Sequence, residues 1–116
     1  MSPRLFVVSI GRDERPIAIG RFIRDQHRTD SAEVAIAVVD EWQGRGIGTV
    51  LVRTLALRAV EVGVRRFTAC ISRENQPAHR LLAAFSGRVS LVRSDRWTIE
   101  YDLSLNEVPR LVAAAG

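Results

Sequence analysis

The sequence predicts an α/β domain in which helices flank a mixed β-sheet, with the element order β-β-β-α-β-α-β-β. Two observations carry this prediction. Runs of β-branched and aromatic residues have the character of strands, and the segments between some of them have a helical spacing of apolar residues. The 116 residues suit one domain, expected over residues 1–116, with a core at about 4–105 and a loose tail at 106–116.

The first half of the chain predicts three strands. Residues 5–10 and 16–23 are expected to form a hairpin, and Gly20 in its second strand indicates a bulge or a close backbone approach. Residues 32–39 are apolar on both faces apart from Glu33, which is typical of a central strand buried on both sides. Glu33 shares one face of this strand with small alanines, which leave room for something else to pack there.

A helix is expected at residues 49–62, closed by Gly63 in a left-handed cap, with Leu51, Leu55 and Ala59 in its apolar stripe. This helix leads into a strand at residues 67–71.

A second helix is expected to start at Asn75-Gln76-Pro77, a cap followed by an early proline, and to run to Gly87. Strands at about residues 89–93 and 97–105 complete the sheet as a hairpin.

Composition excludes several classes of function. The 17 basic residues give a net charge of +4 but are spread over the whole chain, so we expect no nucleic-acid partner. No apolar run approaches the ~20 residues of a membrane span, and no signal peptide is visible, so we expect no membrane partner and a cytoplasmic protein. A single cysteine, Cys70, cannot form an internal disulfide; we expect it to be a small core residue, and we expect no metal.

The segment that carries chemistry is the glycine-rich loop at residues 43–48, which follows the expected central strand and opens a helix. Glycines let the backbone approach an anion, and the first turn of a helix offers unpaired N–H groups, so the ligand expected here is a phosphate or pyrophosphate. A P-loop is excluded because the chain has no lysine in its Gly-Lys-Ser/Thr position. A dinucleotide-binding turn is excluded because Thr49 stands where its third glycine belongs.

Gln43-Gly44-Arg45-Gly46-Ile47-Gly48 resembles the acetyl-coenzyme A loop of the GNAT superfamily of N-acetyltransferases. Asn75-Gln76-Pro77-Ala78, with Leu81-Leu82 after it, is similar to the second cofactor motif of that family. The expected element order matches the family from its second strand to its last, over about residues 4–105. The resemblance implies a GNAT-type fold, acetyl-CoA as cosubstrate and an amine as acceptor.

The resemblance also implies roles for particular residues. The backbone of Ala37 and Val38 would pair with the pantetheine arm, and the N–H groups of the loop would hold the pyrophosphate. Asn75 would bond the pantetheine, although the same residue also suits a plain helix cap. The implied cofactor-binding residues are Ala37, Val38, Gln43, Gly44, Arg45, Gly46, Ile47, Gly48, Thr49 and Asn75.

Glu33 is the candidate catalytic base, because several family members place a glutamate base near the start of this strand; the other interpretation is a strand-end glutamate that faces water or pairs with an arginine. The tyrosine that protonates the departing thiolate in many members corresponds to Leu82 here, and the one tyrosine of the chain is Tyr101. His79 lies in the same helix as Leu82, and solvent is the remaining proton source.

Two function classes therefore stay open: an acetyl-CoA-dependent N-acetyltransferase, and a non-catalytic acyl-CoA-binding or regulatory module on the same fold. Nothing in the chain matches the first strand and two helices with which the family begins, so we expect an N-terminally truncated member. Apolar surface uncovered in this way favours self-association, and we expect a homodimer whose contact is the terminal hairpin with Trp97, Ile99 and Tyr101.

Overall fold

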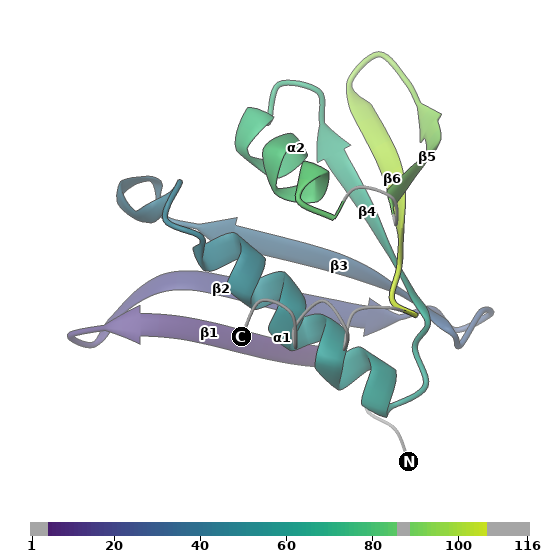
Figure 1. The fold of residues 1–116 in the computed structure, drawn as a ribbon, viewed down its shortest axis with the longest axis horizontal. Helices are drawn as coiled ribbons and strands as arrows, with labels where there is room; N and C mark the ends of the chain where they lie inside the picture. Colours follow the sequence, from purple (N-terminus) through teal and green to yellow (C-terminus); the bar gives the residue numbers. More distant parts are fainter. Residues whose placement is uncertain (1–4, 86–88, 107–116) are drawn as a thin grey trace.

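Six strands form one mixed sheet in the order β1-β2-β3-β4-β6-β5, and two α-helices pack on it (Figure 1). The computed structural model describes residues 5–85 and 89–106, so the tail expected after residue 106 lies outside the described residues. The strands are β1 (Leu5–Arg12), β2 (Arg15–Arg24), β3 (Ser31–Val38), β4 (Arg66–Ser72), β5 (Val89–Ser94) and β6 (Thr98–Ser104). The helices are the 3₁₀ turn η1 (Asp40–Trp42), α1 (Ile47–Glu61) and α2 (Gln76–Ala83).

The expected order of elements is confirmed, and the boundaries differ by a few residues. Helix α1 begins at Ile47, two residues earlier than expected, because the left-handed Gly46 (φ 83°) already turns the chain into the helix. Helix α2 ends at Ala83, before the expected Gly87, and Phe85 lies in the turn that follows. Gly63 has φ 91°, as its expected role after α1 requires.

Strands β1, β2 and β3 form an antiparallel meander under α1. A Cβ atom added at Gly20 would lie 2.9 Å from Leu55 Cδ1, so the Leu55 side chain of the helix would have to shift to admit any side chain there. Of the two expectations for Gly20, the close approach is confirmed, and the irregularity of the β1–β2 ladder lies between Ile10 and Gly11 instead.

Strands β3 and β4 are parallel neighbours for a short distance. Residues 31–33 pair with residues 66–68, and beyond that point the ladder ends and the strands diverge (Figure 1). Strand β4 continues its pairing with β6 over its whole length, and β3 continues with β2. The sheet therefore opens into a V between its two halves.

The core lies between the sheet and the helices, which pack on the same face. Phe22 of β2 and Phe67 of β4 are fully buried with ring centroids 5.7 Å apart. Leu55 of α1 joins them, and Phe85, after α2, belongs to the same cluster. This cluster spans the line where the two halves of the sheet meet, and its burial holds them together.

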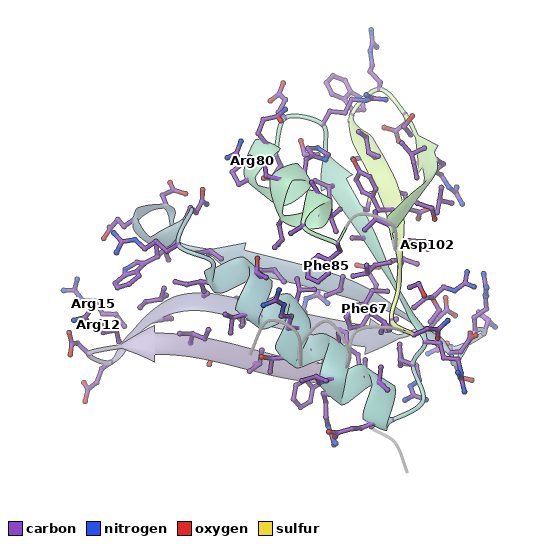
Figure 2. All side chains as sticks on the ribbon, in the orientation of Figure 1. Arg12, Arg15, Phe67, Arg80, Phe85 and Asp102 are labelled. Atoms are coloured by element: carbon purple, nitrogen blue, oxygen red, sulfur yellow. The ribbon has the colours of Figure 1, made fainter. Side chains whose placement is uncertain are left out.

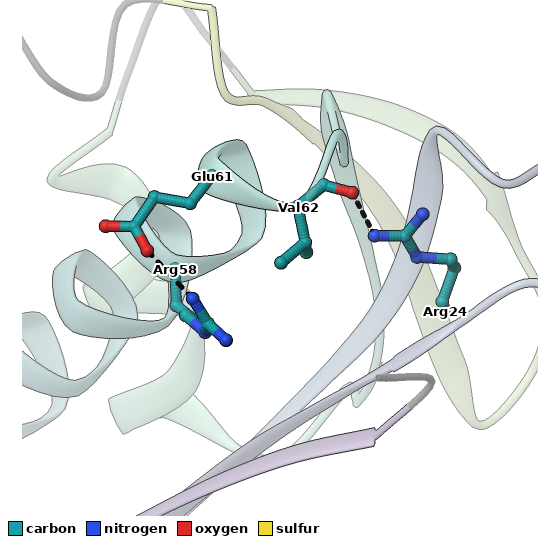
Figure 3. Close-up of polar contacts among 4 residues, drawn as sticks. All are labelled: Arg24, Arg58, Glu61 and Val62. Carbon is teal, nitrogen blue, oxygen red and sulfur yellow. Dashed lines mark hydrogen bonds and ion pairs between the residues drawn. The ribbon is translucent and has the colours of Figure 1, made fainter. Parts of the chain in front are cut away.

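The C-terminal end of α1 is fastened to β2 by Arg24, whose guanidinium donates to the carbonyl oxygen of Val62 (Figure 3). A carbonyl at a helix end has no partner within the helix, so a cation there satisfies it and complements the helix dipole. On the outer surface of the same helix, Arg58 pairs with Glu61 at 2.9 Å.

The opposite face of the sheet carries no helix within the described residues. Leu5, Val7 and Ile19 are about half exposed there, at 51%, 48% and 47%. Two expectations are therefore wrong: β3 is not buried on both faces, since Glu33 and Ala37 are exposed, and Cys70 is an exposed residue instead of a core one. Alternation places all three on the uncovered face, which the apolar composition of these strands did not reveal.

No helix in the described part of the chain is both long enough and apolar enough to span a membrane.

Candidate functional site

A cleft of about 700 Å³ occupies the V between β3 and β4. One wall is residues 33–38 of β3, and the other is residues 69–72 of β4. The glycine loop, the start of α1 and one side of α2 complete the lining. Because the β3–β4 ladder ends at Glu33, the β3 edge beyond it faces the cleft without a neighbouring strand.

The glycine loop presents backbone, not side chains, to this cleft. Gly44 and Gly46 have φ of 76° and 83°, and a Cβ atom on either would meet no other atom within 4 Å. Gly46 is the N-cap of α1, and no side chain caps the helix. The N–H groups of its first turn therefore lack side-chain partners, and Gly48 and Thr49 bring that turn into the cleft lining.

The side chains of Gln43 and Arg45 connect the loop to the residues that precede it. The Gln43 side-chain amide donates to the carbonyl oxygen of Val38 at 3.1 Å and to the Asp40 carboxylate at 3.2 Å. The Arg45 guanidinium lies 4.6 Å from the ring centroid of Trp42. Of the ten expected cofactor residues, eight line the cleft, whereas Arg45 and Ile47 lie outside its lining.

Asn75 combines the two roles between which the sequence left a choice. Its side-chain oxygen accepts a hydrogen bond from Ala78 N at 3.2 Å, which caps α2. The residue is exposed and also lines the cleft. A capping Asn uses its oxygen, so its NH₂ group stays available as a donor on the cleft side.

Glu33 lies where the two strands part, and it lines two hollows at once. One is the cleft; the other has a volume of about 330 Å³ and is lined also by Ile23, Asp25 and Thr68. The backbone N–H groups of His27 and Arg28 donate to the Asp25 carboxylate and hold its pKa below the ordinary value of 3.8. The second hollow thus carries two carboxylates, together with the basic residues Arg24 and His27.

Two charged side chains of the described chain line the cleft. Among its lining residues within the described chain, Glu33 and Arg80 are the charged ones. Figure 2 shows Arg80 projecting from α2 away from β6. Arg80 was not among the expected site residues, because arginines occur throughout the chain and its spacing does not distinguish it from the others.

The proton donor that the family often carries has no counterpart at this cleft. Leu82, which takes the place of the tyrosine, is buried and lines the cleft. Tyr101 instead contacts His79, with 3.0 Å between its hydroxyl and His79 Nδ1, and His79 Nε2 lies 3.0 Å from the Ser72 carbonyl oxygen. Since a carbonyl only accepts, Nε2 carries the proton and Nδ1 accepts from the tyrosine. Neither residue lines the cleft.

Comparison with known proteins decides the family. The model of the GNAT acetyltransferase family matches residues 1–87. The chain belongs to this family. Over 66 residues it is 42% identical to the acetyltransferase Pat of Mycolicibacterium smegmatis, a match that covers 57% of this chain and 20% of the relative.

Solved GNAT structures have the same fold. The GNAT domain of a Streptomyces lividans PAT matches with a TM-score of 0.77 and 26% identity over 87% of this chain and 61% of that one. A cAMP-binding acyltransferase from Mycobacterium smegmatis matches with a TM-score of 0.75 and 30% identity over 96% of this chain and 36% of that one. The chain therefore spans about one fifth of the length of its curated relative and about one third of the mycobacterial structure.

Proposed function

We propose that this GNAT domain transfers the acetyl group of acetyl-CoA to a primary amine. The observation that carries the proposal is the cleft itself, an unpaired strand edge that ends at the start of a helix with no side-chain cap. A long ligand with an amide-containing arm and a pyrophosphate suits such a site, because the arm pairs with the strand and the anion binds the helix N-terminus.

In this arrangement the pantetheine arm runs along residues 34–38 of β3, where Ala37 and Val38 offer backbone groups, as an extended peptide would. The pyrophosphate rests on the loop at residues 43–48, against the N–H groups of Gly48 and Thr49. The NH₂ group of Asn75 bonds the arm from the opposite wall. The thioester then lies toward Glu33, where the strands meet.

Glu33 is proposed as the general base. An alkylamine has a pKa of about 10.4, so only about 1 in 2500 molecules is neutral at pH 7, and a carboxylate beside the reacting amine can accept the proton that its nitrogen loses. The amine, entering through the second hollow, attacks the thioester carbonyl; the C–N bond forms, and the C–S bond breaks. Coenzyme A leaves as a thiolate that takes a proton from solvent, since a thiol with a pKa near 8.5 is a good leaving group.

The second candidate is a non-catalytic acyl-CoA-binding module, which the same cleft would serve and which Leu82 in place of a proton donor favours. Release of free thiol from acetyl-CoA in the presence of an amine panel separates the two. Release that depends on an amine supports the enzyme, and binding of acetyl-CoA without release supports the module.

Two glycines with the same left-handed backbone conformation provide the test of the cofactor site. Gly46 and Gly63 have φ of 83° and 91°, and a Cβ atom at either meets nothing within 4 Å, so Gly→Ala imposes a similar backbone cost at both. Gly46→Ala places a methyl group where the pyrophosphate would lie and is expected to weaken acetyl-CoA binding by calorimetry at least about tenfold. Gly63→Ala, after the far end of α1, should bind as the wild type does; equal affinities in both variants would remove the assignment.

We also propose a homodimer, formed through the terminal hairpin. Strand β5 is an edge of the sheet, and Leu91, Val92 and Trp97 of this hairpin are 60%, 47% and 72% exposed. An exposed apolar edge strand pairs readily with a second copy of itself about a two-fold axis. Ile99 and Tyr101 of the expected contact are half-buried, and Tyr101 is bonded to His79, so other residues of the hairpin would make the contact.

The free and exposed thiol of Cys70 suits a reducing compartment, and we propose that the protein acts in the cytoplasm.

A further inference from the structure

The second hollow, of about 330 Å³, adjoins the cleft at Glu33. In the strand ladders Glu33 is opposite Ile23 of β2 and opposite Thr68 of β4, and paired residues share a face of the sheet. Beyond Ile23, the Asp25 N–H donates to the Ser31 carbonyl oxygen at 2.9 Å, so the pairing continues along the hollow. The period of two therefore places Asp25 and Ser31 on the same face as Glu33. This is the face that carries no helix within the described residues.

Two carboxylates give this hollow negative charge. Asp25 Oδ1 accepts from the backbone N–H groups of His27 and Arg28 at 2.7 and 3.0 Å, which holds the pKa of this carboxyl below its ordinary value. Both bonds use the same oxygen, so Asp25 Oδ2 keeps its lone pairs for another donor. Glu33 is exposed and makes no hydrogen bond and no ion pair within the part of the chain that the structure describes.

The basic residues of the lining are engaged elsewhere. Arg24 is opposite Ala32, which is buried on the helix face, and its guanidinium donates to the Val62 carbonyl oxygen at the end of α1 (Figure 3). His27 contributes its backbone N–H to the Asp25 carboxylate. Among the described residues, no cation of the lining forms an ion pair with either carboxylate.

A buried hydroxyl adds an acceptor at the Asp25 end of the hollow. Ser31 is 5% exposed, the one buried polar residue that the structure describes, and its hydroxyl makes no hydrogen bond within the described chain. Its place on the open face directs this hydroxyl into the hollow, whose lining it joins. Because a buried hydroxyl without a partner costs free energy, a ligand that donates to it gains an interaction here.

Acceptors of this kind suit a ligand that brings positive charge and N–H donors, as an ammonium group does. Glu33 and Asp25 are diagonal neighbours across two antiparallel strands, about 7 Å apart at their Cβ atoms, which is about the length of four or five methylene groups. A single ammonium group at Glu33 leaves Asp25 and Ser31 without a partner. A second ammonium group at that distance satisfies both.

We propose that the second hollow selects diamines as acceptors, with the reacting nitrogen at Glu33 and a second ammonium group bound by Asp25 and Ser31. This inference rests on the proposed function, since it takes the hollow as the entrance of the amine. At pH 7 both nitrogens of such a diamine are protonated. The first gives its proton to Glu33 and forms the C–N bond, and the second keeps its proton and holds the acceptor in place.

Steady-state kinetics with putrescine and butylamine tests the proposal, because the two amines share a four-carbon chain and differ in the second amino group. The wild type should have the lower KM for putrescine. Asp25→Asn keeps an oxygen for the two backbone N–H groups but loses the charge. It should raise the KM for putrescine about 3- to 10-fold at nearly constant kcat, and leave the KM for butylamine close to that of the wild type.

Ser31→Ala, which leaves the carboxylate in place, should change the two KM values in the same directions. Asp30→Asn, at an exposed carboxylate of the same loop outside the lining, is the matched control and should behave as the wild type does. Equal KM values for both amines in the wild type, or an equal rise for both in Asp25→Asn and Ser31→Ala, would overturn the proposal. Acetylation of a lysine-containing peptide but not of putrescine would overturn it as well, since the hollow would then admit a protein side chain.

Calorimetric titration with putrescine separates this proposal from the proposed function. If the wild type acetylates no amine, the proposed function fails. Putrescine binding that weakens in Asp25→Asn but not in Asp30→Asn would then still support a diamine site in the hollow. A wild type that does not bind putrescine would reject that site.

Discussion

The accessibility of the Glu33 carboxylate follows from its position where β3 and β4 separate. Glu33 is the last residue of β3 that pairs with β4, so its backbone is held on both sides while its side chain stays exposed. A residue further along β3 would have a free edge, and one nearer the start would be covered, as Ser31 is. Position in the ladder thus gives Glu33 a fixed backbone and an accessible carboxylate.

Replacing this carboxylate should separate chemistry from cofactor binding. Glu33→Gln keeps the size of the side chain but cannot accept the amine proton, so turnover should fall on the order of 10²-fold, with little change in the affinity for acetyl-CoA. Steady-state kinetics with calorimetry checks this, with Glu61→Gln on α1 as the control. Unaltered turnover in Glu33→Gln would mean that the glutamate only faces water.

At the scale of elements, α2 is positioned by the pair His79–Tyr101. His79 joins α2 to the end of β4 through Ser72 and to β6 through Tyr101. The two residues on the cleft side, Asn75 and Arg80, therefore take their positions from contacts made on the other side of the helix. The one tyrosine of the sequence contacts this helix and does not line the cleft.

Tyr101→Phe removes the hydroxyl and leaves the ring. We expect a loss of about 1 kcal/mol in the free energy of unfolding, because a half-buried His79 nitrogen loses its donor. Urea denaturation measures this loss. Thiol release should keep the pH profile of the wild type, and a changed profile would show instead that Tyr101 takes part in proton transfer.

The β5–β6 turn depends on another single side chain, Asp95. Its carboxylate accepts from the backbone N–H groups of Trp97 at 2.7 Å and of Thr98 at 2.8 Å. These bonds hold the pKa of Asp95 below its ordinary value of 3.8. Because the pKa is lower in the folded state, the ionised carboxylate stabilises the fold at pH values above its ordinary pKa. This stabilisation is lost as the pH falls through the lowered pKa of the folded state.

Asp95→Ala should accordingly lower the Tm at pH 7, and the difference from wild type should shrink below a pH of about 4. Thermal unfolding followed by circular dichroism at several pH values gives the result. Asp30→Ala, which removes an exposed carboxylate outside this turn, is the control. A difference that does not vary with pH would assign the effect of Asp95 to something other than its charge.

Much of the fold could be predicted from the sequence, because the spacing of apolar residues and the residues that begin and end helices are local features. Strand runs, the Gly63 cap and the Asn75-Pro77 helix start each depend on neighbouring residues, and all are found where expected. Burial was harder to predict, since it depends on what covers a face. Cys70 and Ala37 are residue types that are often found in cores, but both lie on the uncovered side of the sheet.

The residues of the candidate site also fall into those that local sequence predicts and those that depend on tertiary packing. The glycine loop and Asn75 could be found from their spacing, because backbone conformation and helix capping are properties of short segments. Arg80 could not be singled out, because its place in the cleft lining depends on how α2 packs beside the preceding helix, as Leu81 does against Gly48. The sequence also could not show that Tyr101 and His79 meet, since 22 residues separate them.

At the scale of the whole molecule, apolar surface is unevenly distributed. Both helices cover one face, and the edge strand β5 and its hairpin expose Leu91, Val92 and Trp97. A domain of this size buries a limited fraction of its surface, so association through such an edge would add to a small stability.

Light scattering at micromolar concentration tests the homodimer. We expect twice the mass of one chain for the wild type and one chain for Val92→Glu, because the variant places a charge in the contact. Val60→Glu, at a comparably exposed valine of α1, should remain dimeric. If the wild type has the mass of a single chain and still acetylates an amine, the dimer proposal is wrong.

Where β3 and β4 separate, the gap between them has the place that a further strand would fill in a continuous sheet. In the free protein, the β3 amides that face this gap have only water to bond, and they should exchange their hydrogens for deuterium rapidly. Amides that face β2 lie in a continuous ladder and should exchange slowly. A ligand that fills the gap would protect alternate positions along one strand, so the exchange pattern would report how the ligand lies without a structure of the complex.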